Sequence, residues 1–212
     1  FIKIGGGRGI GELAASAKTW AGRLKIKLLH RLSPRFVVVT KDLAEELAAF
    51  GLEGACLKHL PNGVDADLYH PVSPEEKAAL RKKLGWPEGL CFLYVGRLSW
   101  EKRLPYFLDA WGKAFLEIPG PYVVLIGEGP EEAHIKEVVA RWPSGRALLL
   151  PPTDQVQAAY AAADIFILPS ISEGLSNALL EAMSSGLSIL ASRVGGTAEA
   201  VEDGRAGLLF DP

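Results

Sequence analysis

From residue 91 onward, short apolar runs alternate with helical segments along the chain. The runs contain β-branched and other large apolar residues without polar alternation, as in Val123-Val-Leu-Ile126. This pattern is typical of strands that are buried on both faces of a sheet. Strands that are joined by helices form parallel sheets with right-handed crossovers. We therefore predict an α/β fold with a doubly wound parallel sheet, whose ligands bind at the carboxyl ends of the strands.

Local sequence signals give the bounds of the expected elements. The predicted strands are 36–39, 55–60, 91–96, 122–127, 147–150, 164–168, 188–192 and 207–210. The predicted helices are 41–50, 75–84, 105–118, 131–142, 154–163, 177–185 and 197–202. The segment 71–74 is bounded by prolines and is predicted to be a linker. Because the chain opens without Met and stops directly after a strand, we expect a fragment that is truncated at both ends.

Composition argues against several classes of protein. The formal net charge of −2 does not provide the basic face that a nucleic-acid partner requires. No apolar run approaches the length of a membrane span, and no signal peptide opens the chain. The two cysteines, Cys56 and Cys91, lie in apolar segments and are expected to be reduced core thiols of a cytoplasmic protein. The four histidines are scattered, so no zinc site is predicted.

A basic, amphipathic stretch covers residues 23–31. Its cations are Arg23, Lys25, Lys27 and Arg31, and Arg35 follows four residues later. One interpretation is peripheral contact with a membrane surface through this N-terminal part. The other, which the usual behaviour of charge runs favours, is a surface helix that packs its leucines on its own domain.

Two glutamates, Glu173 and Glu181, flank the predicted start of a helix. Glu173 lies in the loop after strand 164–168, and Glu181 lies about four residues inside the helix. A helix N-terminus favours a phosphate because of its free N–H groups and its dipole. Glu181 would be roughly 6 Å along the axis from that end. One carboxylate would thus lie on each side of a bound diphosphate, where it can accept hydrogen bonds from sugar and ribose hydroxyls.

Two cations follow another strand. Arg97 comes directly after Gly96 at the carboxyl end of strand 91–96, and Lys102 lies near the start of the next helix. A guanidinium and an ammonium at this position can neutralise a diphosphate. Such a pair can also be two solvated surface cations, and its place at a strand end favours a binding role.

Three other segments have a structural interpretation. Leu125-Ile-Gly-Glu-Gly-Pro130 and Val194-Gly-Gly-Thr197 are predicted turns into helices, and their glycines would also leave room for a ligand. Asp65-Ala-Asp67 has a spacing that can hold a divalent metal beside a diphosphate. Its context, after Pro61-Asn-Gly and before the linker, predicts a turn instead.

Five segments in this order resemble the C-terminal, nucleotide-sugar-binding half of retaining group 1 glycosyltransferases (family 4), which have the GT-B fold. They are Leu60-Pro-Asn-Gly-Val-Asp65, Val95-Gly-Arg-Leu-Ser-Trp-Glu-Lys102, Leu125-Ile-Gly-Glu-Gly-Pro130, Glu173-Gly-Leu-Ser-Asn-Ala-Leu-Leu-Glu181 and Val194-Gly-Gly-Thr197. The resemblance covers roughly residues 36–212. The Glu-x7-Glu spacing together with the Gly-Arg…Lys segment is specific, whereas either alone is less so.

The resemblance implies roles for the candidate residues. Arg97 and Lys102 would hold the donor diphosphate and help it leave, and Glu173 would contact the transferred sugar and take part in catalysis. Glu181 would hydrogen-bond the ribose. The remaining expected substrate contacts are Gly96, Gly174, Leu175, Ser176 and Asn177.

The resemblance also implies the partners and the domain order. The donor would be a UDP-, GDP- or ADP-sugar, used without a metal cofactor, and the acceptor a carbohydrate or lipid-linked hydroxyl in polysaccharide, lipopolysaccharide or glycolipid synthesis. Residues 1–52 would be a remnant of the N-terminal acceptor domain, 53–73 its final strand and a hinge, and 74–212 the Rossmann-like donor domain.

The chain departs from the family pattern in two respects, and two alternative functions stay open. Ser188 stands where family members usually have proline, and most of the acceptor domain is absent, so Gly5–Gly11 is not taken as its glycine loop. The alternatives are a nucleotide-sugar-binding module without catalysis and a sugar-nucleotide epimerase of GT-B architecture.

Overall fold

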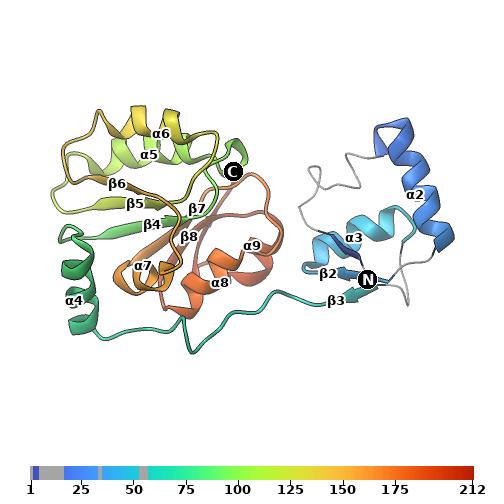
Figure 1. The fold of residues 1–212 in the computed structure, drawn as a ribbon, viewed down its shortest axis with the longest axis horizontal. Helices are drawn as coiled ribbons and strands as arrows, with labels where there is room; N and C mark the ends of the chain where they lie inside the picture. Colours follow the sequence, from blue (N-terminus) through green and yellow to red (C-terminus); the bar gives the residue numbers. More distant parts are fainter. Residues whose placement is uncertain (1, 5–16, 33–34, 53–56) are drawn as a thin grey trace.

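The computed structural model describes residues 2–4, 17–32, 35–52 and 57–212, which form two parallel sheets (Figure 1). The small sheet has the strand order β1-β2-β3, and the large sheet has the order β6-β5-β4-β7-β8-β9. An extended segment between β3 and α4 joins the two units (Figure 1). The predicted domain boundaries at residues 52 and 73 remain predictions. The segment Gly5–Gly11 and Cys56 lie outside the described residues.

Every described strand pairs in parallel, which confirms the predicted doubly wound α/β fold. The small unit contains β1 (Ile2–Ile4), α2 (Trp20–Leu32), β2 (Phe36–Val38), α3 (Lys41–Ala49) and β3 (Leu57–His59). The large unit contains α4 (Pro74–Leu84), β4 (Cys91–Val95), the 3₁₀-helix η2 (Trp100–Lys102), α5 (Leu104–Phe115), β5 (Tyr122–Ile126), α6 (Glu132–Val139), β6 (Ala147–Leu150), α7 (Val156–Ala162), β7 (Ile165–Leu168), α8 (Asn177–Ser184), β8 (Ser188–Ser192), α9 (Gly195–Ala200) and β9 (Gly207–Phe210).

The core of the large unit lies on both sides of its sheet. All five residues of β5 are buried, as expected for a strand with helices on both faces. In Figure 1, α5 and α6 lie above the sheet, and α7 and α8 lie below it. Cys91 is a free, buried thiol, and its burial raises its pKa to about 12. This confirms the prediction of a reduced core thiol for Cys91.

The register aligns the carboxyl ends of neighbouring strands. Val95 at the end of β4 lies opposite Ile126 at the end of β5, and Leu168 of β7 lies opposite Ala191 of β8. The loops that follow these strands therefore emerge at one edge of the large sheet, where ligands of such sheets bind.

Helix α2 carries an exposed apolar stripe. Trp20, Leu24, Leu28 and Leu32 recur every four residues and are 79, 56, 53 and 66% exposed. Ile26, on another face, packs against the core of the small unit. The interpretation in which the leucines of residues 23–31 pack on their own domain is thus wrong for Leu24 and Leu28, whose side chains the structure describes. No helix in the described part of the chain is long and apolar enough to span a membrane.

Candidate functional site

The loops after β4 and β5 touch each other backbone to backbone. A Cβ atom on Gly127 would lie 1.9 Å from the carbonyl oxygen of Gly96, and one on Gly129 would lie 2.3 Å from that of Leu98. Gly127 also has a φ of 152°, which favours glycine. The two glycines therefore fix the shape of this strand-end edge through loop packing.

The loops after β7 and β8 meet in the same way. A Cβ on Gly195 would lie 2.0 Å from the carbonyl oxygen of Glu173, and one on Gly196 would lie 2.4 Å from that of Gly174. We expected the glycines of Val194-Gly-Gly-Thr197 to leave room for a ligand. Instead, the neighbouring loop fills that room, because the backbone of residues 173–174 packs directly on α9.

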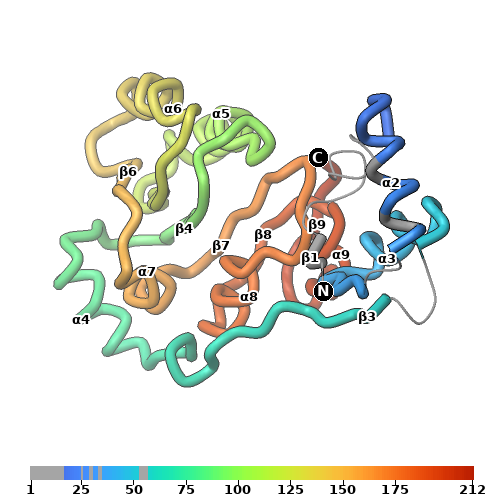
Figure 2. Tube along the Cα trace, turned by 45° about the vertical axis from the view of Figure 1, so that its right-hand side comes forward, coloured from blue at the N-terminus to red at the C-terminus, as the bar shows by residue number. Residues whose placement is uncertain are grey.

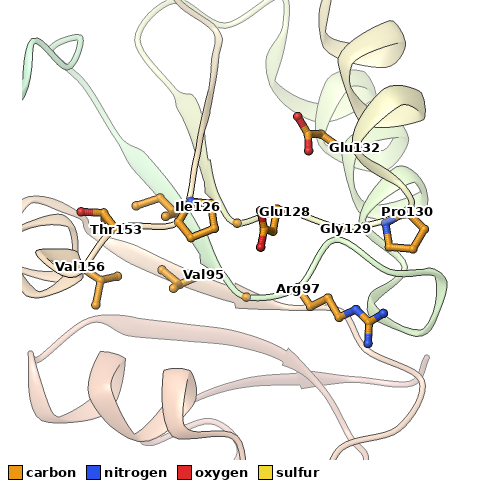
Figure 3. Close-up of a pocket in the computed structure, with 12 residues that line it drawn as sticks. Val95, Arg97, Ile126, Glu128, Gly129, Pro130, Glu132, Thr153 and Val156 are labelled. Carbon is orange, nitrogen blue, oxygen red and sulfur yellow. The ribbon is translucent and has the colours of Figure 1, made fainter.

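A cavity of about 670 Å³ opens at the carboxyl ends of β4 and β5 (Figure 3). Arg97 lies at one end of it, whereas Thr153 and Val156 lie at the opposite end, with Glu128 between them. Its lining is Val95, Gly96, Arg97, Ile126, Gly127, Glu128, Gly129, Pro130, Glu132, Pro152, Thr153 and Val156. Among the predicted site residues, only Gly96 and Arg97 belong to this lining.

Arg97 presents a guanidinium without a hydrogen-bond partner in the described part of the chain. The backbone of Arg97 is held in place, because Tyr94 Oη donates a hydrogen bond to the Arg97 carbonyl oxygen over 2.8 Å. Burial, and then the charges of Glu173 and Glu101, raise the pKa of Tyr94, so this phenol keeps its proton. The exposed guanidinium therefore has all five N–H donors available to an anion.

Lys102 and Glu173 form an ion pair beside this turn. Lys102 Nζ lies 2.5 Å from Glu173 Oε1, and the two side chains are only 19 and 10% exposed. Ser170 Oγ donates to the same oxygen over 2.6 Å. Since an ammonium has three donors, Lys102 can hold Glu173 and still donate to a phosphate.

Glu101 lies between the two candidate cations, Arg97 and Lys102, in the sequence. Burial raises the pKa of Glu101, but the hydrogen bond from Ser99 (2.5 Å) and the charges of Lys102 and Arg97 lower it, and the net shift is downward. Glu101 is therefore an ionised carboxylate near both cations, with Ser99 as its hydrogen-bond donor.

Sequence reasoning missed Ser170, Tyr94 and Glu101. Ser170 follows the end of β7 closely, as Arg97 follows β4, and this position was the available signal. Tyr94 looks like an ordinary core residue, and Glu101 looks like a solvated charge.

Glu181 lies on α8 beside two tyrosines. Burial and then Glu181 raise the pKa of Tyr160 and of Tyr69. Tyr160 is four residues after Val156 on α7, so the two side chains share a helix face. Glu181 is therefore next to α7, which carries Val156 of the cavity lining, whereas Glu173 pairs with Lys102. Neither glutamate belongs to the lining itself.

Helix α8 begins at one of the two predicted N-cap residues. Ser176 is the N-cap, and its side chain accepts from the N–H of Leu179 over 3.4 Å, ahead of Asn177 as the first helical residue. The side chain of Leu175 packs against the core of the small unit. The Leu175 side chain is only partly buried by this contact, and its predicted contact with the substrate stays a prediction.

Asp65 serves the turn that its context predicted. Its Oδ1 accepts from the N–H groups of Asp67 and Leu68 over 3.1 and 3.2 Å. Across the described ranges, no group of three or more His, Cys, Asp or Glu side chains could hold a metal ion. The expectation of a metal-independent site stays a prediction.

Residues 89–212 match the family model described as "Glycosyl transferases group 1". The chain belongs to this family of glycosyltransferases. Its large unit is the Rossmann-like half of the GT-B fold that its relatives have.

Two curated relatives and one solved structure show how far the similarity extends. The sulfoquinovosyl transferase SQD2 of Arabidopsis thaliana is 32% identical over 88% of this chain and 36% of that protein. A GDP-mannose-dependent alpha-mannosyltransferase of Corynebacterium glutamicum is 28% identical over 95% of this chain and 45% of that protein. Anabaena HepE, solved in complex with UDP and glucose, has a TM-score of 0.78 and 25% identity over 90% of this chain and 52% of that one. The chain thus spans about half or less of the length of these three proteins.

Proposed function

We propose that this chain contains the donor site of a glycosyltransferase, which moves a sugar from a nucleoside diphosphate sugar to an acceptor hydroxyl with retained anomeric configuration. The observation that carries the proposal is the edge where Arg97, whose guanidinium has no hydrogen-bond partner among the described residues, lines a cavity. Lys102, five residues along the chain, is held there by Glu173. Such an edge offers positive donors to a diphosphate and a carboxylate to a sugar.

The proposed roles are those that the family resemblance implies. In the reaction, the bond from the anomeric carbon to the diphosphate oxygen breaks, and negative charge builds on the departing diphosphate. A bond from the same carbon to the acceptor oxygen forms, and the proton of the acceptor hydroxyl passes to the departing diphosphate. Arg97 and the free donors of Lys102 stabilise that charge. Glu173 accepts hydrogen bonds from the transferred sugar, and Glu181, near the far end of the cavity, accepts them from the ribose.

The helix start supplies further contacts in this proposal. Backbone N–H groups of Gly174, Ser176 and Asn177 donate to the sugar or the phosphates, with support from the dipole of α8. The donor is a UDP-, GDP- or ADP-sugar. Anabaena HepE has been solved with UDP-glucose, and the corynebacterial relative is named for GDP-mannose, so both bases occur among the proteins that this chain resembles.

Calorimetry on the 212-residue chain tests the donor site. We expect UDP, GDP or ADP to bind in the presence of EDTA, because Arg97 and Lys102 supply the positive charge that a metal would otherwise provide. Arg97→Ala is expected to weaken binding at least tenfold, since a charge-assisted hydrogen bond contributes about 1.5–3 kcal/mol. Arg141→Ala, which removes an exposed cation from the region after α6, is the matched control.

Different outcomes separate the alternatives. Absence of binding with all three nucleotides, or binding that strictly requires a divalent cation, contradicts the proposed site. A module without catalysis would bind the nucleotide, but the intact protein would neither transfer nor hydrolyse the donor. An epimerase would turn over the sugar nucleotide without an acceptor.

We propose in addition that α2 contacts an anionic membrane surface and brings the site to a lipid-linked acceptor. The exposed apolar stripe of Trp20, Leu24, Leu28 and Leu32 supports this proposal. The exposed cations Arg23, Lys27 and Arg31 precede the three leucines by one residue each, so a basic row runs beside the stripe. An apolar face next to a basic row is the arrangement of interfacial helices.

Vesicle sedimentation with the intact protein tests this contact. We expect binding to vesicles that contain phosphatidylglycerol and little binding to pure phosphatidylcholine, because the basic row attracts anionic lipid. The double variant Leu24→Glu/Leu28→Glu should lose the binding, whereas Leu60→Glu/Leu68→Glu, at two other exposed leucines, should keep it. If the intact protein binds to neither kind of vesicle, the proposal is wrong. Another part of the protein would then cover the stripe.

A further inference from the structure

The two units meet at the loop that carries Glu173. Asn62, in the extended segment after β3, donates from Nδ2 to the carbonyl oxygen of Leu175 over 2.7 Å. The side chain of Leu175 packs against the core of the small unit, which is formed by Phe36, Val38, Val39, Leu43, Leu47 and Leu52. The loop at residues 173–177 therefore has one side fixed by elements outside the large sheet.

A second contact between the units lies at the start of α3. Glu199 Oε1, on α9, accepts from the backbone N–H groups of Lys41 and Asp42 over 2.7 and 3.2 Å. Thr40 is the N-cap, and its side chain accepts from the N–H of Leu43 over 3.3 Å. The first amides of a helix have no partner within the helix, and here a carboxylate about 158 positions away satisfies two of them. Its negative charge also suits the positive end of the helix dipole.

Gly196 connects these two contacts. A Cβ atom there would lie 2.4 Å from the carbonyl oxygen of Gly174 and 2.7 Å from Thr40 Cγ2. Gly196 and Thr40 are both buried. Figure 2 shows α9 next to α3, in agreement with the contacts between these two helices. Three segments, 40–42, 173–175 and 195–199, thus touch at one place.

We propose that Asn62, Leu175 and Glu199 form a clamp between the units, which holds the 173–177 loop in the geometry that a bound diphosphate sugar requires. This inference rests on the proposed function for its consequence at the donor site. The three are positioning residues, because they act on the loop backbone and on α3. Separation of the two units loosens the loop, and a loosened loop weakens the contact between the units. The small unit is thereby part of the donor site, although the cavity is lined by the large unit.

Amide exchange of the 212-residue chain, followed by NMR, tests the clamp directly. Glu199→Ala should speed exchange of the Lys41 and Asp42 amides about two- to fivefold, the range for a charge at an exposed helix end. It should also speed exchange in residues 173–177, which Glu199 does not hydrogen-bond. Glu199→Gln, which keeps an acceptor oxygen, should give smaller changes at both places. Glu202→Ala, three residues along and paired with Arg205, is the matched control and should alter neither.

The variant Asn62→Asp tests the other half of the clamp. It keeps the shape of the side chain but replaces the N–H donor by an oxygen that faces a carbonyl. Exchange of the 173–177 amides should rise about two- to tenfold, the worth of one hydrogen bond, and nucleotide binding should weaken by a similar factor. Asp67→Asn, on the same extended segment, is the control.

The outcomes separate the clamp from the proposed function. If Glu199→Ala alters only the amides of α3, the two contacts are independent and the clamp is refuted. If the loop amides respond but nucleotide affinity does not, the clamp does not serve the donor site. If the unmodified chain binds no nucleotide, the proposed function fails, while the exchange data still decide whether the clamp exists.

Discussion

Substitution of Lys102 by alanine in the intact protein will lower the turnover number of sugar transfer by about 10²–10³-fold. The ammonium donates to the charge that develops on the departing diphosphate, and loss of one such donor raises the barrier by a few kcal/mol. The variant also leaves Glu173 without its cation at a position that is 10% exposed, with Ser170 as its remaining hydrogen-bond donor.

The measurement is steady-state transfer with saturating donor and acceptor. Lys113→Ala is the matched control, because Lys113 also pairs with a carboxylate, Asp109, but is 76% exposed and lies on α5 outside the cavity. Its turnover should stay at the parent level. A Lys102→Ala enzyme that is as active as the control would exclude Lys102 from charge stabilisation and leave it a structural partner of Glu173.

Substitution of Gly127 by alanine will lower the free energy of unfolding of the 212-residue chain by roughly 2–6 kcal/mol. About 1–3 kcal/mol comes from the unfavourable backbone conformation, and a similar amount comes from the steric clash. The clash is with the backbone of Gly96, 1.9 Å from the new Cβ, which cannot rotate away as a side chain could. Relief of the clash has to separate the loops after β4 and β5, so the variant will also lose nucleotide affinity.

Urea denaturation followed by fluorescence gives the free energy, and Gly85→Ala provides the control. Gly85 also has a positive φ, of 67°, but a Cβ there would meet nothing within 4 Å. Gly85→Ala should lower the free energy of unfolding only through the unfavourable backbone conformation, by about 1–2 kcal/mol. Equal costs for the two variants would show that the loops after β4 and β5 move apart freely, and that the contact does not define the site.

The elements of the fold could be predicted from the sequence because their signals are local. The predicted helix 75–84 became α4, in which Ser73 and Glu76 form a capping box and Gly85 ends the helix in the left-handed conformation. Strand β5 was evident from its unbroken apolar run, since burial on both faces allows no polar alternation. Each of these features depends on neighbours within a few residues.

The details of the site depend on distant contacts and could be predicted only in part. The proximity of Lys102 and Glu173 was implied by the family resemblance, which assigns both residues to one donor site. The direction of the Leu175 side chain was not, because it is decided by a core that is built from residues 36–52. The same holds for Glu199, whose partners on α3 precede it by more than 150 positions. The contacts of Gly127 and Gly195 were hidden because a glycine that permits a turn and one that permits two loops to touch look alike in a sequence.

The ion pair between Lys102 and Glu173 has a consequence for the entropy of ligand binding. A free lysine side chain has about 2 kcal/mol of rotamer entropy, and a ligand that immobilises it has to overcome that cost. Here the glutamate restricts the lysine before any ligand arrives, in a place where both side chains are largely buried. The entropy of the Lys102 side chain is thus lost during folding, and an anion that binds here has a smaller entropic cost to overcome.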